Sequence, residues 1–277
     1  MEYTFVPAKF WNIGTLEFSH VSVGTSMVSE VFGFTVRGKN MKRFVMMLQA
    51  DLKNISRDAM SFMILLVPPL LFLVMKFLIP LFQILVVEWF DLSHYYSLIF
   101  SVFIIMVPYM TGILAGFLLL DERDQHILEV IAITPLQRSG HLWFRSGSMM
   151  FLSVAFAIGL YPWSSLVTPN WLRLIFVVLV ATLEVPLFAL FLLSIAQNKV
   201  EGLAISKFMG LFSFAPILAY FLPGIWKYTM AWSPPFWLVQ AYLAESQPAF
   251  WIFLVVGLLY HSLLLWVLIG HMERKSE

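Results

Sequence analysis

The chain has 277 residues, of which 60% are hydrophobic and 12% charged, whereas soluble domains are roughly 45–50% apolar and about a quarter charged. This composition excludes an ordinary soluble domain, and a formal net charge of +1 offers no basic surface for nucleic acid, which we exclude as a partner. The absence of cysteine excludes disulfides and thiolate metal sites.

The first 40 residues differ in kind from the rest of the chain. Gly, Ser and Thr are frequent there, and residues 17–23 roughly alternate between apolar and polar, as a strand does. No cleavable signal peptide is visible, so internal spans are expected to drive membrane insertion. Two interpretations stay open: residues 1–40 are a genuine cytoplasmic extension of unknown role, or translation begins at Met41 and the segment is a gene-calling extension.

Residues 41–58 are predicted to form an amphipathic helix in the membrane interface. Apolar side chains such as Phe44, Leu48 and Leu52 form one stripe, and basic side chains such as Lys42 and Lys53 lie opposite. The basic face would meet anionic headgroups while the stripe enters the acyl boundary. Such a helix leads the chain into its first span.

Six stretches are long and apolar enough to cross a bilayer, which takes about 20 residues because the lipid core is about 30 Å thick and offers no backbone hydrogen-bond partners. They are residues 59–82, 97–120, 142–161, 171–196, 203–222 and 250–269. The sequence therefore predicts an all-α polytopic protein with a membrane domain at residues 59–270 and a short tail at residues 271–277. Six spans place both termini on one side of the bilayer.

Lysine and arginine indicate which side this is, because they stay cytoplasmic in short loops and near span ends. With the N-terminus inside, fourteen of the 17 lysines and arginines are cytoplasmic, whereas only Arg173 and Lys227 are outside and Lys76 lies within the first span. We therefore expect both termini in the cytoplasm and a multi-pass location in the cell membrane.

Residues 223–248 precede the last span and are rich in proline and aromatic side chains. The pair Pro234 and Pro235 would interrupt any spanning helix, and the segment has too few consecutive apolar residues to cross. It is predicted to form short elements at the outer surface.

The densest polar segment is the loop between the second and third spans, residues 120–139. Asp121, Glu122 and Asp124 are expected to open a short helix, because acidic side chains favour a helix N-terminus. Apolar residues follow, and Pro135 is expected to end the helix. An apolar patch away from lipid usually binds a protein partner, although a helix that rests on the membrane surface remains the alternative.

This loop resembles that of the permease subunits of ATP-binding-cassette (ABC) exporters of the type-2 class. The family pattern is an acidic-Glu-Arg group, a short helix with a Glu, and then Thr-Pro-Leu. The corresponding residues here are Asp121-Glu122-Arg123, Glu129 and Thr134-Pro135-Leu136. Many relatives have Gly-Thr where this chain has Gln125-His126, which affects the helix details and not the class.

A second match lies between the fourth and fifth spans and is similar to prokaryotic drug-export permeases of this class. It is the run Asn198-Lys199-Val200-Glu201-Gly202-Leu203-Ala204. The outer proline- and aromatic-rich segment also fits, so the resemblance covers residues 41–269.

The resemblance implies a permease subunit that pairs with a second copy or a paralogue and with cytosolic ABC ATPase subunits. The chain has no G-x-x-x-x-G-K-[ST] motif, since its Gly38-Lys39 pair is followed by Asn40, so it is expected not to be an enzyme and to carry no cofactor. ATP and Mg²⁺ would be bound by the partner ATPase. The family's coupling residues would be Glu122, Arg123, Glu129, Thr134 and Pro135, and the second cytoplasmic loop would contribute Asn198, Lys199, Glu201 and Gly202.

Lys76, Glu184 and His261 are ionisable residues within predicted spans, where charge is costly. Lys76 lies near the outer end of the first span, where its long stem can carry the ammonium group to the interface. Glu184 lies midway along the fourth span, two residues before Pro186, and must be neutral or paired. A role for Glu184 in transport or subunit packing and a simple interhelical hydrogen bond stay equally open. His261, midway along the sixth span, is expected to be neutral and bonded to a neighbouring helix.

The leading hypothesis is export of a hydrophobic or amphiphilic compound, such as a drug, an antibiotic or a lipid-like molecule. The alternatives are a membrane-embedded enzyme that uses Glu184 or His261, and a non-catalytic membrane scaffold or channel. Co-purification of a stoichiometric P-loop ATPase would favour the exporter, and turnover by the chain alone would favour the enzyme. The cargo, and the choice between homodimer and heterodimer, do not follow from the sequence.

Overall fold

The structure is a computed structural model that describes residue 49, residues 51–133 and residues 137–276. The extension at residues 1–40, most of the predicted interfacial helix and residues 134–136 lie outside the described residues. All elements of the described part are helical, and six helices are long and apolar enough to cross a membrane. The predicted all-α fold with six spans is thereby confirmed.

The candidate spans agree with the six predicted stretches to within a few residues. They are Ala59–Val86, Leu92–Asp124, Gly140–Ser164, Trp171–Ile195, Lys199–Phe221 and Gln247–Met272. The fifth span begins earlier than predicted because Asn198 caps its helix. The first helical turn therefore includes two charged residues, Lys199 and Glu201. Capping, and not hydropathy, sets that end.

The first span follows a short helix at residues 51–57, which we call the entry helix. It consists of α3 (Ala59–Leu73), the π-helical turn η1 (Val74–Leu78) and α4 (Ile79–Val86). Asp58 has extended backbone and its carboxylate accepts a hydrogen bond from the Ser61 N–H, which starts α3. In η1, the Lys76 ammonium group lies 5.6 Å from the centre of the Phe72 ring.

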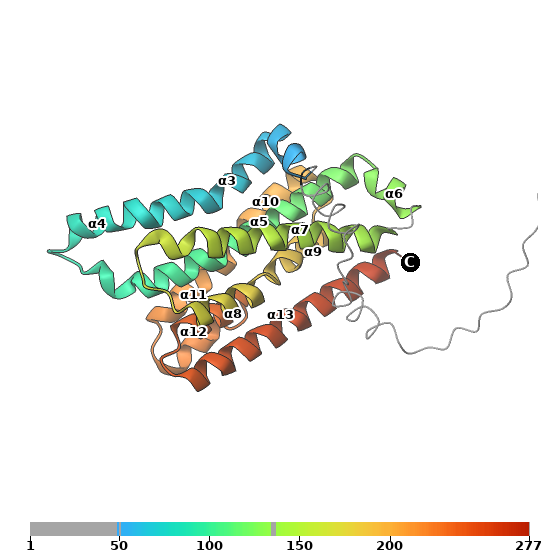
Figure 1. Ribbon diagram of the computed structural model, residues 1–277. Coiled ribbons are helices and arrows are strands. Elements are labelled where there is room, and N and C mark those ends of the chain that lie inside the picture. Colours follow the sequence, from blue (N-terminus) through green and yellow to red (C-terminus); the bar gives the residue numbers. More distant parts are fainter. Residues whose placement is uncertain (1–48, 50, 134–136, 277) are drawn as a thin grey trace, which may run out of the picture. The chain divides into compact units, whose positions relative to one another are not determined.

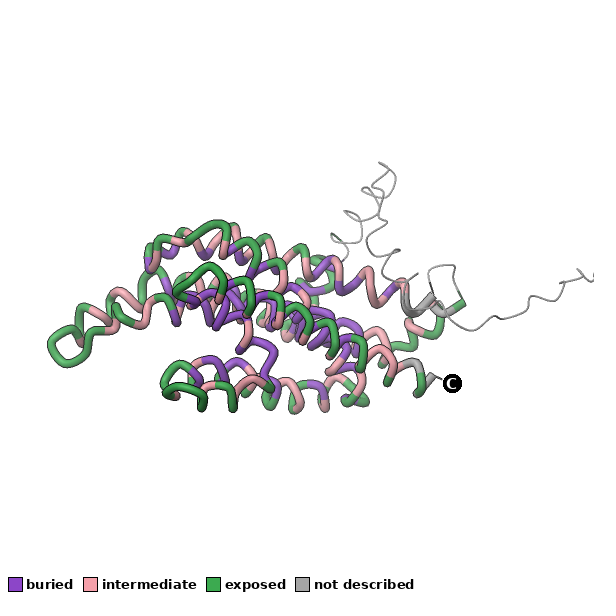
Figure 2. The backbone as a smooth tube through the Cα atoms, turned by 90° about the horizontal axis from the view of Figure 1, so that it is seen from below, coloured by how far each residue is buried: buried purple, intermediate pink, exposed green. Residues whose placement is uncertain are grey.

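The second span is the centre of the bundle (Figure 1). It consists of the 3₁₀ turn η2 (Leu92–Tyr95) and α5 (Tyr96–Asp124), and α5 packs against the first, third, fourth and fifth spans. Gly112 and Gly116 permit close approach of the fourth span: a Cβ at Gly112 would lie 3.0 Å from three of its backbone atoms. Buried residues gather along the middle of the bundle, whereas the first and last spans carry long exposed runs (Figure 2).

The third span is α7 (Gln137–Gly159) with the 3₁₀ turn η3 (Tyr161–Ser164), and the fourth consists of α8 (Trp171–Ala181) and α9 (Glu184–Ile195). The fourth span is interrupted at Thr182 and Leu183. Pro186 has no N–H to donate to the carbonyl of Thr182, which instead accepts from the Val185 N–H at 3.1 Å. The proline that the sequence placed beside Glu184 therefore breaks the helix.

The fifth span is formed by α10 (Lys199–Met209) and α11 (Leu211–Phe221), and the sixth lies within α13 (Gln247–Ser276). Between them, the 3₁₀ helix η4 (Gly224–Met230) and α12 (Pro234–Leu243) are short, and neither is a candidate span. The prediction of short elements there is confirmed. Most of α12 is buried, because it packs against α5, α8, α11 and α13 and does not rest on the surface of the bundle.

One expectation about the polar loop is wrong. Asp121, Glu122 and Asp124 belong to the last turn of α5 and do not open the loop helix, α6, which runs Ile127–Ala132. Their contacts with other helices keep α5 helical for one turn beyond its apolar stretch. The chain then turns at His126, whose φ of 58° is left-handed, and only Glu129 lies in the first turn of α6.

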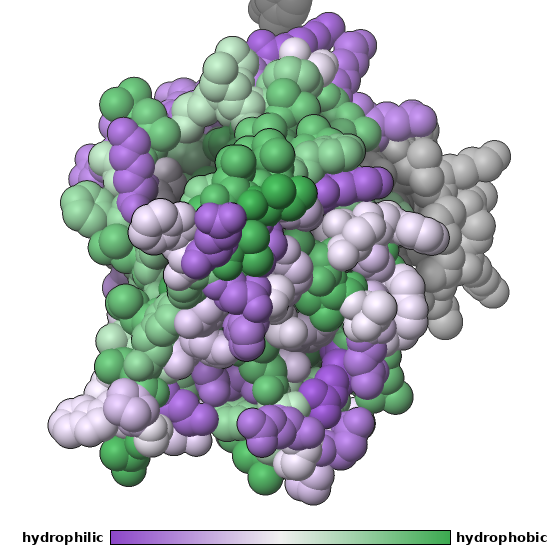
Figure 3. Space-filling model, turned by 90° about the vertical axis from the view of Figure 1, so that its left-hand side faces the viewer, coloured by the Kyte–Doolittle hydropathy of each residue, from purple (hydrophilic) through white to green (hydrophobic). Residues whose placement is uncertain are grey.

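The end of the bundle where α5 ends and α7 begins is here called the α6 end, and the opposite end is called the α4 end. The last turn of α13 lies at the α6 end (Figure 1). At the α4 end, apolar and polar side chains lie side by side on the surface (Figure 3). There α4 exposes Ile84 and Leu85, which are 72% and 69% accessible.

Candidate functional site

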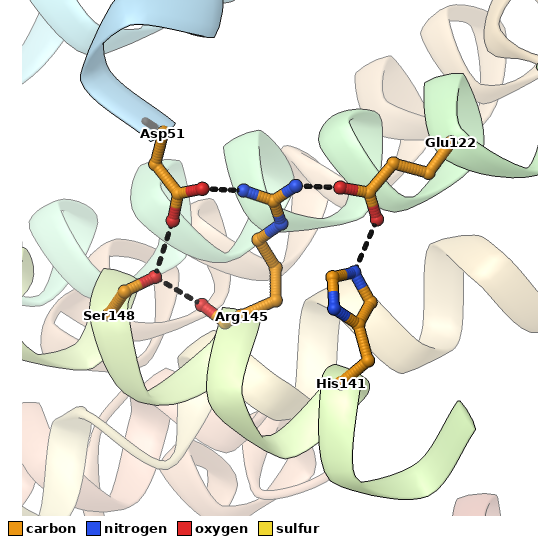
Figure 4. A network of polar contacts seen from close by, with 5 residues as sticks. All are labelled: Asp51, Glu122, His141, Arg145 and Ser148. Carbon is orange, nitrogen blue, oxygen red and sulfur yellow. Dashed lines mark hydrogen bonds and ion pairs between the residues drawn. The ribbon is translucent and has the colours of Figure 1, made fainter. Parts of the chain in front are cut away.

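A buried arginine joins three helices at the α6 end (Figure 4). Arg145 of α7 donates from Nη1 to the carboxylate of Asp51 in the entry helix and from Nη2 to the carboxylate of Glu122 in α5. The second oxygen of Glu122 lies 2.7 Å from Nε2 of His141, and the Ser148 hydroxyl donates to Asp51 at 2.9 Å. We call these five residues the Arg145 network.

The Arg145 network is largely shielded from solvent, with side-chain exposures of 5% for Arg145, 8% for Asp51 and 13% for Glu122. Removing one partner of a buried ion pair costs about 3–5 kcal/mol, because the remaining charge is left uncompensated. Arg145 faces two carboxylates, so its loss would leave two such charges. The network therefore holds the entry helix, the end of α5 and the start of α7 together.

From the sequence, Arg145 is predicted only to be a cytoplasmic charge. A usable signal was present, because Arg145 is the fourth residue of the predicted third span, and ionisable groups inside spans usually face protein. Its partner Asp51 is far away in the sequence and belongs to a segment predicted only as an interfacial helix. No spacing rule connects the two residues.

A second group of charges at the α6 end centres on Lys199, the first residue of α10. Its Nζ lies 2.7 Å from the Asp58 carboxylate and 3.5 Å from that of Asp121, and its backbone N–H donates to Asp124 at 3.1 Å. Burial alone would raise the pKa of Asp58, but hydrogen bonds from Lys199 and Ser61 together lower it to about 2. These contacts hold the start of α3 and the start of α10 to the end of α5.

Arg123 points back into the bundle. Its guanidinium donates to the carbonyl of Leu193 at 3.1 Å and to that of Ala196 at 2.5 Å, at the C-terminus of α9. A cation is stabilised there because the last carbonyls of a helix carry partial negative charge. Arg123 thus joins α5 to α9.

The matched residues of the second loop build the turn between α9 and α10. The Asn198 side chain accepts from the Glu201 N–H at 2.9 Å, and the Glu201 carboxylate accepts from the Gln197 N–H at 2.7 Å. These reciprocal bonds resemble a capping box. Gly202 faces α5, because a Cβ there would lie 2.6 Å from Cδ1 of Leu120.

By contrast, α6 presents an exposed surface. Val130 is 63% and Ile133 88% accessible, and Nδ1 of His126 lies 2.9 Å from the exposed carboxylate of Glu129. That hydrogen bond is the largest cause that raises the pKa of His126 above its usual range. We call His126, Ile127, Glu129, Val130 and Ile133 the α6 surface.

The structure therefore divides the predicted coupling residues. Glu129 lies on the α6 surface, whereas Glu122 and Arg123 contact other helices of the bundle. Thr134 and Pro135 lie outside the described residues.

A cavity of about 700 Å³ lies between α3, α5, α10 and α11. Most of its wall is apolar and includes four methionines, at positions 60, 63, 106 and 110, and Lys207 is the charged residue among the described residues that line it. Ligand pockets of roughly 300–1,000 Å³ enclose drug-sized molecules, and methionine adapts its shape to irregular apolar partners. The Tyr109 hydroxyl, in the cavity wall, donates to the carbonyl of Ser206 at 3.3 Å.

Glu184 and His261 are brought together inside the bundle. Both side chains are fully buried, and Oε1 of Glu184 lies 3.6 Å from Nε2 of His261. Neither residue lines the cavity. His261 was expected to bond to a neighbouring helix, but its Nδ1 bonds to the Gly257 carbonyl of its own helix, and its Nε2 only approaches Glu184 of the fourth span.

Residues 51–269 match the model of the family described as Fluoroquinolones export permease protein Rv2686c-like. Two relatives from Mycobacterium tuberculosis are each 29% identical over 231 residues, covering 81% of this chain and 92% of the relative. They are the fluoroquinolones export permease proteins MT2760, of strain CDC 1551 / Oshkosh, and Rv2686c, of strain ATCC 25618 / H37Rv. No solved structure was found to match the chain.

Proposed function

Because the chain belongs to the Rv2686c-like family of fluoroquinolone export permeases, we propose that it exports an amphiphilic, drug-like compound as the membrane subunit of an ABC exporter. The observation that carries this proposal is the methionine-rich cavity between α3, α5, α10 and α11. An apolar wall of this size suits a flat aromatic molecule, and the relatives are named for fluoroquinolones, which are such molecules.

The proposed orientation places the α6 end in the cytoplasm. It rests on the predominance of lysine and arginine in the segments that meet at this end, since such residues stay cytoplasmic near span ends. Export then carries the compound from the α6 end toward the α4 end, outward across the cytoplasmic membrane.

The proposed motor is a cytosolic ABC ATPase that binds ATP and Mg²⁺ and docks on the α6 surface. Exposed Val130 and Ile133 supply apolar contact, and the charged pair of His126 and Glu129 supplies orientation. A second permease copy or a paralogue would complete the transporter, because an ABC motor works as a dimer.

Coupling follows from which helices meet at the α6 end. The pairs of Lys199 with Asp58 and Asp121 connect α10, α3 and α5, which are three of the four helices that line the cavity. ATP binding that shifts α6 would move the end of α5 and, through these ion pairs, α3 and α10. The balance between inward- and outward-open states then changes, since each state contacts the nucleotide-bound motor differently.

The test is ATP-dependent accumulation of a fluorescent fluoroquinolone in inside-out vesicles that contain the chain and its co-purified ATPase. Replacement of Met106 by Trp should fill the cavity and reduce accumulation, because Met106 lies in the cavity wall. Replacement of Leu179 by Trp, on the exposed face of α8, is the matched control and should change nothing. Accumulation equal to wild type in the Met106→Trp variant would remove the cavity from the transport route.

A further inference from the structure

The carboxyl group of Glu184 and the imidazole of His261 meet near the middle of their spans, Trp171–Ile195 and Gln247–Met272. Both are 0% exposed. The separation of 3.6 Å between Oε1 and Nε2 is slightly longer than a hydrogen bond, and a small rotation of either side chain closes it. Neither oxygen of Glu184 nor Nε2 of His261 has a hydrogen-bond partner among the residues that the structure describes.

The other imidazole nitrogen shows which nitrogen of His261 can gain or lose a proton. Nδ1 of His261 lies 2.7 Å from the carbonyl of Gly257, one turn earlier in α13. A carbonyl oxygen only accepts hydrogen bonds, so Nδ1 must carry a hydrogen and donate it. Nε2 is then the nitrogen whose proton can vary, and it is the one that faces Glu184.

Burial decides where the variable proton lies. An isolated carboxylate in a site without water is strongly disfavoured, so Glu184 and His261 must hold one proton between them and be neutral as a pair. With that proton on His261, the carboxylate would need several donors, and the described part of the chain supplies none besides the imidazole. With the proton on Glu184, a single O–H to Nε2 hydrogen bond uses the carboxyl hydrogen and the imidazole lone pair, and no charge remains buried.

The pair lies at the break in the fourth span. Glu184 is the first residue of α9, directly after the interruption at Thr182 and Leu183. Helix breaks inside a membrane are tolerated where protein surrounds them, and here Gly112 of α5 lies directly against the backbone of Glu184. An interaction at this position can set the angle between α8 and α9.

The same break lies behind the cavity wall. Phe188, one turn after Glu184, packs edge-on against Tyr109, with 4.9 Å between the ring centres. Tyr109 lines the cavity. A rotation of α9 about the break would therefore move Phe188, which packs against Tyr109. Because a bound compound would contact Tyr109, the rotation would change the cavity wall.

We propose that Glu184 and His261 form an intramembrane proton site, in which the neutral carboxyl group of Glu184 donates to Nε2 of His261 and positions the broken fourth span behind the cavity. Each residue is a positioning residue, since neither touches the cavity. The proton site stands on the geometry alone, whereas its part in transport rests on the proposed function.

Infrared difference spectroscopy on the full chain in lipid at neutral pH tests the proton site. The carbonyl stretch of a protonated carboxyl group is separate from the bands of a carboxylate. Wild type minus Glu184→Gln should contain the protonated band, and the band should shift in His261→Phe, which removes the acceptor. Its absence from the difference spectrum would show an ionised Glu184 and overturn the proposal.

Export measured at matched membrane levels tests the positioning role. Glu184→Gln should retain most of the wild-type rate because its amide N–H can still donate to Nε2, whereas Glu184→Ala should lose about tenfold or more. Ser262→Ala, next to His261, is the control and should match wild type. Equal loss in the Gln and Ala variants, or no loss in either, would overturn the role. If wild type itself exports nothing, the proposed function fails while the infrared result still decides the proton site.

Discussion

Lys199 and Asp58 lie 141 positions apart in the chain, yet the lysine Nζ is 2.7 Å from the aspartate carboxylate. Asp58 caps α3 and Lys199 opens α10, so this ion pair connects the first and fifth spans at the α6 end. Both helices line the cavity. A change in this pair is therefore expected to alter the cavity wall as well as the stability of the bundle.

The Asp58 ion pair predicts a specific dependence of stability on pH. Because the folded state lowers the pKa of Asp58 from 3.8 to about 2, its ionised form contributes stability above about pH 4, and that contribution is lost as the pH falls toward 2. Asp58→Asn should remove this part of the pH dependence while keeping the helix cap, since asparagine caps as well as aspartate. Thermal unfolding of both proteins in detergent, compared at neutral and acid pH, measures the difference.

At neutral pH the Asn variant should be the less stable protein. The difference in melting temperature between it and wild type, here called the gap, should become smaller as the pH falls. Lys199→Gln should give at least the same gap, because it removes the other partner of this pair and also the cation beside Asp121. A gap that is constant across the pH range would show that the Asp58 charge is not the source of the stability.

Arg145 is predicted to be the most sensitive charged residue at the α6 end. Arg145→Met should destabilise the protein by about 3–5 kcal/mol, because it leaves the carboxylates of Asp51 and Glu122 buried without a cation. Arg274→Met, an exposed change near the C-terminus, should be close to neutral. The free energy of unfolding in mixed micelles is the measurement.

A second variant separates buried charge from poor packing. Adding Asp51→Asn and Glu122→Gln to Arg145→Met removes the uncompensated charges and should recover much of the loss. No recovery would mean that the Arg145 side chain acts by filling space.

Much of the fold could be predicted from hydropathy, because span length is set by the bilayer and the capping and proline signals are local. The contacts of Glu122 and Arg123 could not be predicted, because their partners come from other helices. These partners are Arg145, Leu193 and Ala196. In a sequence, acidic residues between two helices are equally compatible with the end of the first helix and the start of the second. The meeting of Glu184 and His261 likewise depends on how α9 packs on α13, which no periodicity encodes.

Two glycines with different surroundings give a prediction about helix packing. Gly112→Ala should destabilise the bundle, since its Cβ would lie 3.0 Å from backbone atoms of Glu184 and Val185, which cannot move aside as a side chain can. Gly147→Ala, with nothing within 4 Å, should stabilise α7 by about 1 kcal/mol through helix propensity. Melting temperatures in detergent compare the two. Equal effects would contradict the close approach of α5 and α9.

The last prediction concerns two glutamates that the sequence assigned to one role and the structure places in two. Glu122 is 13% exposed and forms an ion pair with Arg145. Glu122→Lys would place a second cation beside the buried guanidinium and should reduce the amount of folded protein. Glu129 is 66% exposed on the α6 surface, so Glu129→Lys should leave folding unchanged.

The two variants should therefore fail in different ways. If the α6 surface docks an ATPase, Glu129→Lys opposes partner charges and should lose ATPase during purification and lose export, at normal membrane levels. A helix that merely rests on the bilayer would tolerate this change or bind anionic headgroups more strongly. Glu245→Lys, an exposed reversal near the α4 end, is the control, because that end lies opposite the α6 surface. Retained ATPase and normal export in Glu129→Lys would remove α6 from the coupling mechanism, and a normally folded Glu122→Lys would show that the Arg145 network does not hold this end together.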